Sequence, residues 1–226
     1  MVLIWGLCAV LLVTVLTVSS RSGAARLAAR AGYLDLCVPL FAQPLKGVAE
    51  TGFARVSGQY RGQMFDVQVV PDSLNLRKLP CLWLLVTVVE RLPVAGTFDV
   101  MLRATGAETF SKFGTLPDQI AVPPGFPEGC TIRTDATGAM PGAAVIARYM
   151  AGLDKARLKE VVVAPTGLRV VWLVEEADRG RYLLFRDAEM GGAALPADVL
   201  QPLMNGLFDL CAGLQAEAAP KLQVVG

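Results

Sequence analysis

The sequence predicts an α+β fold, in which an N-terminal transmembrane helix precedes a mainly antiparallel sheet packed by a short middle helix and a C-terminal amphipathic helix. Strand-like segments follow one another as hairpins, and helical patterns come after groups of strands rather than between every pair. The chain also begins with an unbroken apolar run. We divide it into an anchor (1–20), a juxtamembrane basic helix and linker (21–52), an α+β domain (53–217) and a C-terminal tail (218–226).

The apolar run at residues 2–18 carries no charge, and its only polar side chains are Thr14 and Thr17. As a helix it would cover about 26 Å, close to the roughly 30 Å hydrocarbon core of a bilayer. A secretory signal peptide needs a basic residue before its apolar stretch, and this chain has none. We therefore expect a retained anchor. The alternative is a signal cleaved at the small residues 22–24.

Three arginines that follow the apolar run predict its orientation. Arg21, Arg26 and Arg30 lie directly after it, and positive residues beside a membrane segment stay on the cytoplasmic side. The sequence thus predicts a single-pass protein of the plasma (inner) membrane with its N-terminus outside and its domain in the cytoplasm. The lipid bilayer is its first predicted partner, through the N-terminal helix.

Composition excludes several classes of function. Hydrophobic residues make up 54% of the chain and its mean hydropathy is +0.49, whereas 21 basic and 20 acidic residues leave a net charge of +1. That balance argues against a nucleic-acid partner. The chain has no histidine, which removes Ser-His-Asp and Cys-His nucleophilic sites and H-E-x-x-H zinc sites. We assign no cofactor and no metal.

The five cysteines indicate a reducing compartment. Their number is odd, one lies in the apolar run, and no two form a C-x-x-C pair. Such cysteines act as small hydrophobic residues. Two disulfides in an exported domain are the alternative.

In the first half, residues 31–50 are broken by Pro39 and Pro44, and we predict a linker there. Regular structure is expected from Phe53, as two strands joined by a tight turn at Arg61-Gly62. Residues 80–93 form a run of Leu, Val and Trp between prolines, which predicts a strand buried on both faces.

The middle of the chain alternates strand and loop signals. Residues 98–106 predict the next strand, and the four prolines between 116 and 129 predict irregular structure. Residues 130–135 should return to the sheet. A short helix is then expected over 143–153, with Pro141 suiting its first position and Gly152 ending it.

The last third predicts three strands and a helix. The strands cover residues 159–165, 167–176 and 180–188, with turns at Pro165-Thr166-Gly167 and at 178–180. Leucines repeat at helical spacing over 198–217, so this helix should pack broadly on the sheet, although Pro202 lies near its start. A diverged internal duplication is an alternative description, but no repeat is visible at the level of residues.

Acidic residues offer the main candidates for chemistry. Asp66 and Asp99 each follow a phenylalanine in a strand pattern, which places two carboxylates on one sheet and suits acid–base work. A simpler interpretation turns them to water or pairs them with an arginine such as Arg77 or Arg103. Asp135, Glu175 and Glu176 are further acids. No residue is assigned as catalytic, cofactor-binding or metal-binding.

Gly58, Tyr60 and Gly62 form a G-x-Y-x-G hairpin, which a double-proline loop, the segment CTIRTD and a unit of three strands and a helix follow. With the preceding anchor, this arrangement resembles a class of uncharacterised bacterial single-pass membrane-anchored proteins. The resemblance implies a bacterial membrane location and no established activity, so it assigns no functional residue.

The sequence therefore predicts a membrane-anchored, non-enzymatic interaction module that binds a protein partner. The alternative is a lipid or other apolar ligand bound between the sheet and the terminal helix at the membrane surface. An enzyme that uses carboxylates alone is a further hypothesis, and it requires a cleft with two or more convergent acids.

Overall fold

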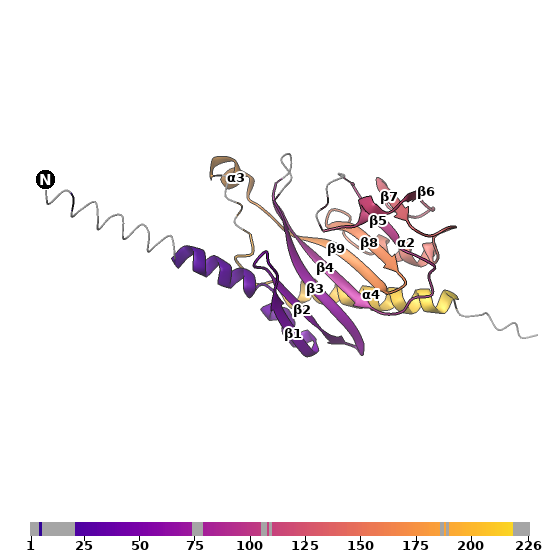
Figure 1. The fold of residues 1–226 in the computed structure, drawn as a ribbon, viewed down its shortest axis with the longest axis horizontal. Coiled ribbons are helices and arrows are strands. Elements are labelled where there is room, and N and C mark those ends of the chain that lie inside the picture. The colour runs from indigo at the N-terminus through magenta and orange to yellow at the C-terminus, as the bar shows by residue number, and fades with distance from the viewer. Residues whose placement is uncertain are drawn as a thin grey trace, which may run out of the picture.

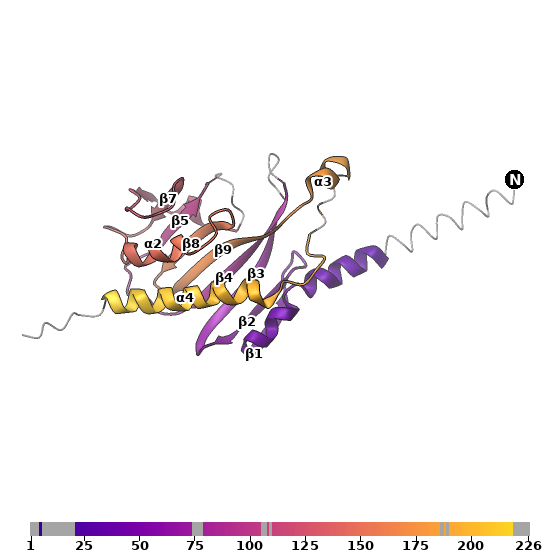
Figure 2. The ribbon, with the colours of Figure 1, turned by 180° about the vertical axis from the view of Figure 1, so that it is seen from behind.

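In a computed structural model of the chain, nine strands form one antiparallel sheet in the order β1-β2-β3-β4-β9-β8-β5-β7-β6, and helix α4 runs along one of its faces (Figures 1 and 2). This confirms the predicted α+β class with a mainly antiparallel sheet. The structure describes Trp5 and residues 21–73, 79–104, 108, 110–185, 188 and 190–218.

The strands are β1 (Ala42–Val48), β2 (Ala54–Tyr60), β3 (Gln63–Asp72), β4 (Cys81–Val89), β5 (Phe98–Leu102), β6 (Asp118–Ile120), β7 (Cys130–Thr134), β8 (Leu158–Ala164) and β9 (Gly167–Glu176). The helices are η1 (Asp35–Leu40), η2 (Phe113–Thr115), α2 (Ala143–Ala151), α3 (Arg179–Phe185) and α4 (Ala197–Ala218). A further helix covers 21–31.

The predicted anchor, residues 1–20, lies outside the described residues apart from Trp5. Among the helices that the structure does describe, none combines the length and the apolar character needed to cross a membrane.

The core lies between the sheet and α4, as the leucine pattern predicts. The five leucines of that pattern are at most 3% exposed, namely Leu200, Leu203, Leu207, Leu210 and Leu214. The helix begins at Ala197 and continues through Pro202, which removes only one hydrogen bond near its first turns. On its other flank α4 packs against α2.

The hairpin of the G-x-Y-x-G pattern is held onto α4. Arg61 and Gly62 both have positive φ (51° and 84°), which is the two-residue turn predicted here. Tyr60 donates a hydrogen bond from its hydroxyl to Asn205 Oδ1 over 2.8 Å, and the Arg61 guanidinium lies 4.1 Å from the ring centre of Phe208.

Residues 31–50 do not form the expected linker. They contain η1 and the edge strand β1, and they contribute Tyr33, Leu34, Cys37 and Phe41 to the core. Their prolines are compatible with this because Pro39 lies in a short 3₁₀ helix and Pro44 in an edge strand beside a register shift.

Three further predictions about secondary structure are wrong. Residues 118–120, inside the stretch predicted to be irregular, form the short edge strand β6. Residues 179–185 form α3 rather than a third strand, because β4 and β8 already occupy both sides of β9. Leu183 and Leu184 point out of it, 59% and 77% exposed. Pro141 is not the first residue of its helix: Gly142, with φ of 64°, is the N-cap, and α2 begins at Ala143.

The order of the strands is the feature that creates the site. β5 follows β4 in the chain but does not pair with it, because the hairpin of β8 and β9 lies between them. β5 instead pairs with β8 on one side and β7 on the other. Side chains of β5 and β8 therefore become neighbours, although about 60 residues separate them in sequence.

Candidate functional site

A row of polar side chains crosses the face of the sheet opposite α4. The register places Asp66 opposite Thr87, Thr87 opposite Arg169, Arg169 opposite Val162, and Val162 opposite Asp99. Directly opposed residues point to the same face of a sheet. Four of the five residues in this outer row are polar, whereas the face of the sheet under α4 is apolar.

The segment that follows β5 folds over this outer face. We call residues 110–117 the strap. The Phe110 ring lies 5.4 Å from that of Trp83 on β4, and Phe113 and Leu116 are both buried. Arg133 on β7 donates from Nη2 to the Pro117 carbonyl oxygen over 3.3 Å. The strap is thus fixed at both ends, and it walls off part of the outer face.

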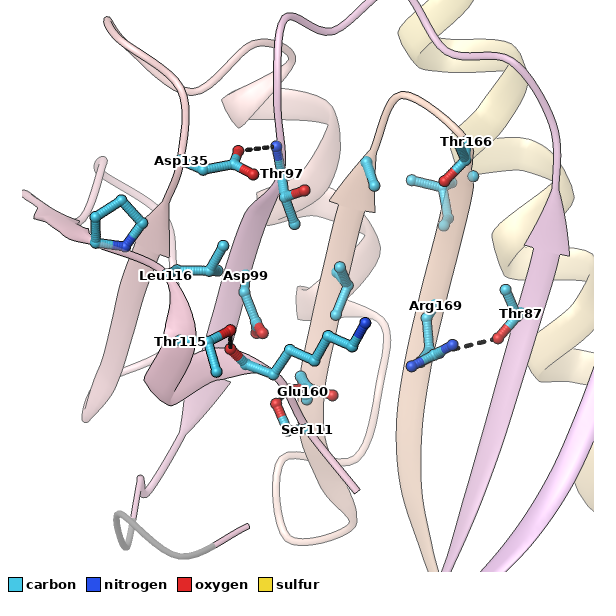
Figure 3. A pocket seen from close by; sticks show the side chains of 16 residues that line it. Thr87, Thr97, Asp99, Ser111, Thr115, Leu116, Asp135, Glu160, Thr166 and Arg169 are labelled. Carbon is cyan, nitrogen blue, oxygen red and sulfur yellow. Dashed lines mark hydrogen bonds between the residues drawn. The ribbon is translucent and has the colours of Figure 1, made fainter. Parts of the chain in front are cut away.

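A pocket of about 510 Å³ lies between the strap and strands β4, β9, β8 and β5 (Figure 3). That volume is sufficient for a small-molecule ligand. Its hydroxyl groups come from Thr87, Thr97, Ser111, Thr115 and Thr166, and its charged or titratable groups from Asp99, Lys112, Asp135, Glu160 and Arg169.

Asp99 and Glu160 meet at the floor of this pocket. Asp99 faces Val162 and Glu160 faces Met101, so the two acids occupy diagonal positions on neighbouring strands of one face. Both side chains are almost fully buried: Asp99 is 2% and Glu160 1% exposed. Figure 3 shows the two carboxyl groups between β5 and β8, with Ser111 beneath them.

The hydrogen bonds of this carboxyl pair are incomplete. Ser111 donates its hydroxyl hydrogen bond to Glu160 Oε1. Asp99 Oδ1 and Glu160 Oε2 are buried, and within the described part of the chain no donor reaches either oxygen. Two buried carboxylates cannot both stay ionised at such proximity, because their charges repel and water is excluded. A proton held by one acid supplies the missing donor to the other.

Burial is the main cause of the altered titration of this pair. It raises the pKa of Asp99 to about 9, and the neighbouring charge of Glu160 adds to the rise. Burial also raises the pKa of Glu160, while its hydrogen bonds with Ser111 and Asp99 and the positive charges of Arg169 and Lys159 act in the opposite direction. At neutral pH Asp99 therefore keeps its proton.

Hydrogen bonds also fix the remaining walls of the pocket. Arg169 donates from Nε to Thr87 Oγ1 over 3.0 Å, which holds its guanidinium along the floor. Asp135 accepts a hydrogen bond from the Thr97 backbone N–H at 2.6 Å on the opposite side (Figure 3). The site thus combines a positive group, an acidic pair that holds a proton, and several hydroxyls. Such a set can bind a polar ligand or move a proton.

Asp66 and Asp99, considered above as a possible acid–base pair, do not meet. Both lie on the outer face, but β4, β9 and β8 separate their strands, a distance of about 19 Å. Asp66 instead accepts a 2.7 Å hydrogen bond from Arg55 Nε, which is the simpler interpretation of such an acid. Asp99 pairs with Glu160, which sequence reasoning missed.

One sequence signal for Glu160 existed. It is the only acid inside the apolar strand segment KEVVVA, at a position where burial is expected on both faces. The other predicted acids do not join it: Asp135 lies at the pocket wall, while Glu175 accepts from the Gly191 N–H at 2.9 Å in a different region. Glu176 lines a third pocket.

The three arginines of the predicted topology lie on the helix at residues 21–31. Arg21 and Arg26 are exposed, whereas Arg30 is half-buried and its guanidinium lies 5.2 Å from the ring centre of Phe53. Arg26 and Arg30 also line a second pocket of about 470 Å³, together with Glu175. Arg30 therefore packs onto the domain, and the topological role of all three stays a prediction.

Within the described residues, no three histidine, cysteine, aspartate or glutamate side chains gather closely enough to hold a metal ion. The outer-face pocket is therefore the candidate site, through its carboxyl pair. No family model, no curated protein and no solved structure matches this chain.

Proposed function

We propose that the protein is a binding domain for a small polar ligand, which it holds in the outer-face pocket with the Asp99–Glu160 pair as its anchor. The carboxyl pair is the observation that carries this proposal. Its acids reach the pocket from two strands distant in sequence, and each has an oxygen without a hydrogen-bond donor among the described residues.

The energetic cost of the pair supports a functional interpretation. Burying an uncharged polar group without a hydrogen bond costs on the order of 2–7 kcal/mol, and burying an ionised carboxylate costs more. The neighbouring outward position on β5 is occupied by Met101, which is fully buried, so an apolar side chain fits this part of the sheet. Groups with strongly shifted pKa values cluster at functional sites, and this pair lies in a cleft.

The lining of the pocket favours a polar ligand over an apolar one. Five hydroxyl groups and five charged or titratable groups contribute to it. The alternative of a lipid between the sheet and α4 gains less support, because α4 lines none of the three pockets described above and its leucines are packed. We therefore propose a hydrogen-bonding ligand in the outer-face pocket, in place of an apolar ligand under α4.

Acid–base catalysis by the same pair is a second candidate function. One specific observation favours it: a proton-holding acid and a proton-accepting oxygen lie side by side in a cleft. This meets the condition of convergent acids that a carboxylate-only enzyme requires. Under this alternative, Asp99→Asn would abolish turnover of a ligand that the pocket still binds.

Our proposal keeps the domain at the inner face of a bacterial membrane, anchored by residues 1–20, with a protein partner as a further expectation. The charge bias of Arg21, Arg26 and Arg30 supports the orientation. An export-dependent phosphatase fused after Gly226 should be inactive, and a cytoplasmic fluorescent reporter there should be bright. Phosphatase activity in this fusion would place the domain outside and reopen the question of disulfides.

The ligand proposal is tested by a survey of small neutral, cationic and anionic molecules against the full-length protein in detergent. Val162 lies on the pocket floor between Asp99 and Arg169, so Val162→Phe should block the pocket and abolish binding detected by NMR. Val48→Phe, on the exposed edge strand β1, is the matched control and should bind normally. Binding that survives in Val162→Phe, or no binding by any molecule, would overturn the proposal.

A further inference from the structure

We propose that the ligand carries a primary ammonium group, and that this cation takes the place of the proton shared by Asp99 and Glu160. This inference rests on the proposed function and names the class of ligand for the same pocket. Its basis is the pair of acceptor oxygens at the pocket floor together with the charges around them.

The pocket floor holds two carboxyl oxygens that can accept hydrogen bonds. Asp99 Oδ1 and Glu160 Oε2 lack a donor among the described residues, and their side chains are more than nine-tenths buried yet line the pocket. A single proton provides one donor for these two carboxyl groups. An ammonium group provides three donors and no acceptor, so it can satisfy both oxygens at once.

The charged groups of the pocket determine which net charge a ligand must carry. Arg169 and Lys112 contribute two positive charges to the pocket, and Asp135 contributes one negative charge. With one proton on the pair the pocket is electrically neutral, and without that proton it carries one excess negative charge. A ligand with a single positive charge therefore restores neutrality when the proton leaves.

Three of the protein's own cations near the pair bond to other groups, while the exposed Lys112 of the strap lines the pocket but reaches neither Asp99 Oδ1 nor Glu160 Oε2. Arg169 donates from Nε to Thr87 on its far side. Lys159, next to Glu160 in the chain, donates to the carbonyl oxygens of Leu102 and Arg103 and forms an ion pair with Glu108. Arg133, opposite Asp99 on β7, reaches the Pro117 carbonyl. Once the proton of the pair has left, Asp99 Oδ1 and Glu160 Oε2 therefore need an external donor.

A divalent metal fits this site less well than an ammonium group. Magnesium and calcium bind through at least six oxygen ligands, usually with several carboxylates or waters. In the described part of the chain, the pair finds no third carboxylate at metal-binding distance. The hydroxyl-rich walls suit a ligand with further hydrogen-bonding groups beside its amine, such as an amino alcohol.

The exchange has a quantitative consequence. Each cation that binds below the upper pKa of the pair releases one proton to solvent, so the observed affinity should rise about tenfold per pH unit. The rise should end near the upper pKa of the pair or of the amine itself, whichever is lower. Conversely, a saturating cation should lower the upper pKa of the pair, by about one unit at ten times its Kd.

The test is a pH titration of full-length protein labelled with ¹³C in its Asp and Glu carboxyl groups. It is run in detergent with ethanolamine, with ethylene glycol, with magnesium chloride, and with sodium chloride at matched ionic strength. Ethanolamine has an amine in the position where ethylene glycol has its second hydroxyl, and the two molecules are otherwise the same. We expect ethanolamine alone to lower the upper pKa of the pair, and Asp99→Asn to remove the effect while Asp66→Asn preserves it.

Other outcomes contradict the inference in distinguishable ways. An equal shift with ethylene glycol would indicate a neutral ligand, and a shift with magnesium chloride but not with ethanolamine would indicate a metal. No shift with any of them overturns the ammonium ligand. The proposed function fails separately, if the survey finds no molecule whose binding Val162→Phe removes.

Discussion

Two neighbouring rows of residues cross the same five strands and serve different ends. The row that faces α4 consists of Phe65, Val88, Leu168, Val163 and Phe98, none more than 2% exposed. The adjacent row, one residue away on each strand, lies on the opposite face and holds Asp66, Thr87, Arg169, Val162 and Asp99. All of these residues except Asp66 line the pocket. One face of this sheet supplies the stability of the fold, while the other presents its chemistry.

The two ends of the outer row show how the strap makes this difference. Asp66 and Asp99 share the local sequence Phe-Asp and the same face of the sheet. Asp66 remains near solvent beside Arg55, and its side chain is 22% exposed. Asp99 lies under the strap beside Glu160 and holds a proton. Tertiary context, and not local sequence, gives the two aspartates their different burial and different partners.

The largest effect is expected from the apolar row. Phe65→Ala should reduce the free energy of unfolding by about 4 kcal/mol, because it removes a fully buried aromatic ring and leaves a cavity. Urea denaturation of the full-length protein measures this loss. The titration of the carboxyl pair should not change in the folded fraction. A loss below about 1 kcal/mol would show that the face under α4 does not determine stability.

The second prediction concerns Asp99→Asn and pH. The pKa of Asp99 rises from an ordinary 3.8 to about 9 on folding, so between these values the folded state holds a proton that the unfolded state has lost. The free energy of unfolding should therefore fall as pH rises through this window, by up to about 1.4 kcal/mol per unit. Asp99→Asn should flatten this slope, measured by urea denaturation between about pH 5 and pH 8. An unchanged slope contradicts the buried pair.

A smaller effect is expected at the G-x-Y-x-G hairpin, which joins the sheet to α4 away from the pocket. Tyr60→Phe removes the hydrogen bond to Asn205 and should lower the free energy of unfolding by about 1 kcal/mol. Thermal denaturation measures it, and ligand binding in the pocket should be unaffected. If Tyr60→Phe altered binding, the two faces would not be independent.

The smallest effect is expected at the exposed end of the outer row. Asp66→Asn breaks an ion pair whose arginine side chain is 56% exposed, and should change the free energy of unfolding by no more than about 0.5 kcal/mol. Asp66 does not belong to the buried pair, so this variant leaves the Asp99–Glu160 contact in place. This variant is the control for Asp99→Asn, and a similar response from both would remove the contrast between the two aspartates.

Sequence reasoning recovered most elements and missed their long-range arrangement. The hairpin at Arg61-Gly62, the doubly buried strand β4 and the helix α4 all follow from local signals, namely turn residues and apolar periodicity. The insertion of β8 and β9 between β4 and β5 has no local signal, because antiparallel partners can be distant in sequence. Glu160 could therefore not be assigned to Asp99.

The helix α3 and the strap were missed for related reasons. Residues 180–188 are apolar enough for a strand, but a strand also needs a free sheet edge, and the edges of β9 are occupied. Most of the strap carried no prediction, and its role depends on contacts of Phe110 with Trp83 and of Phe113 with Arg133. Both features depend on which strands are neighbours.

Infrared spectroscopy of the full-length protein at neutral pH tests most directly whether the outer face holds a protonated carboxyl pair. The C=O stretch of a protonated carboxyl should be present, should disappear as pH rises through about 9, and should be absent from the double variant Asp99→Asn/Glu160→Gln. Asp66→Asn should leave it unchanged. If the unaltered protein shows no such band at neutral pH, both acids are ionised, and the buried pair that anchors the proposed ligand does not exist.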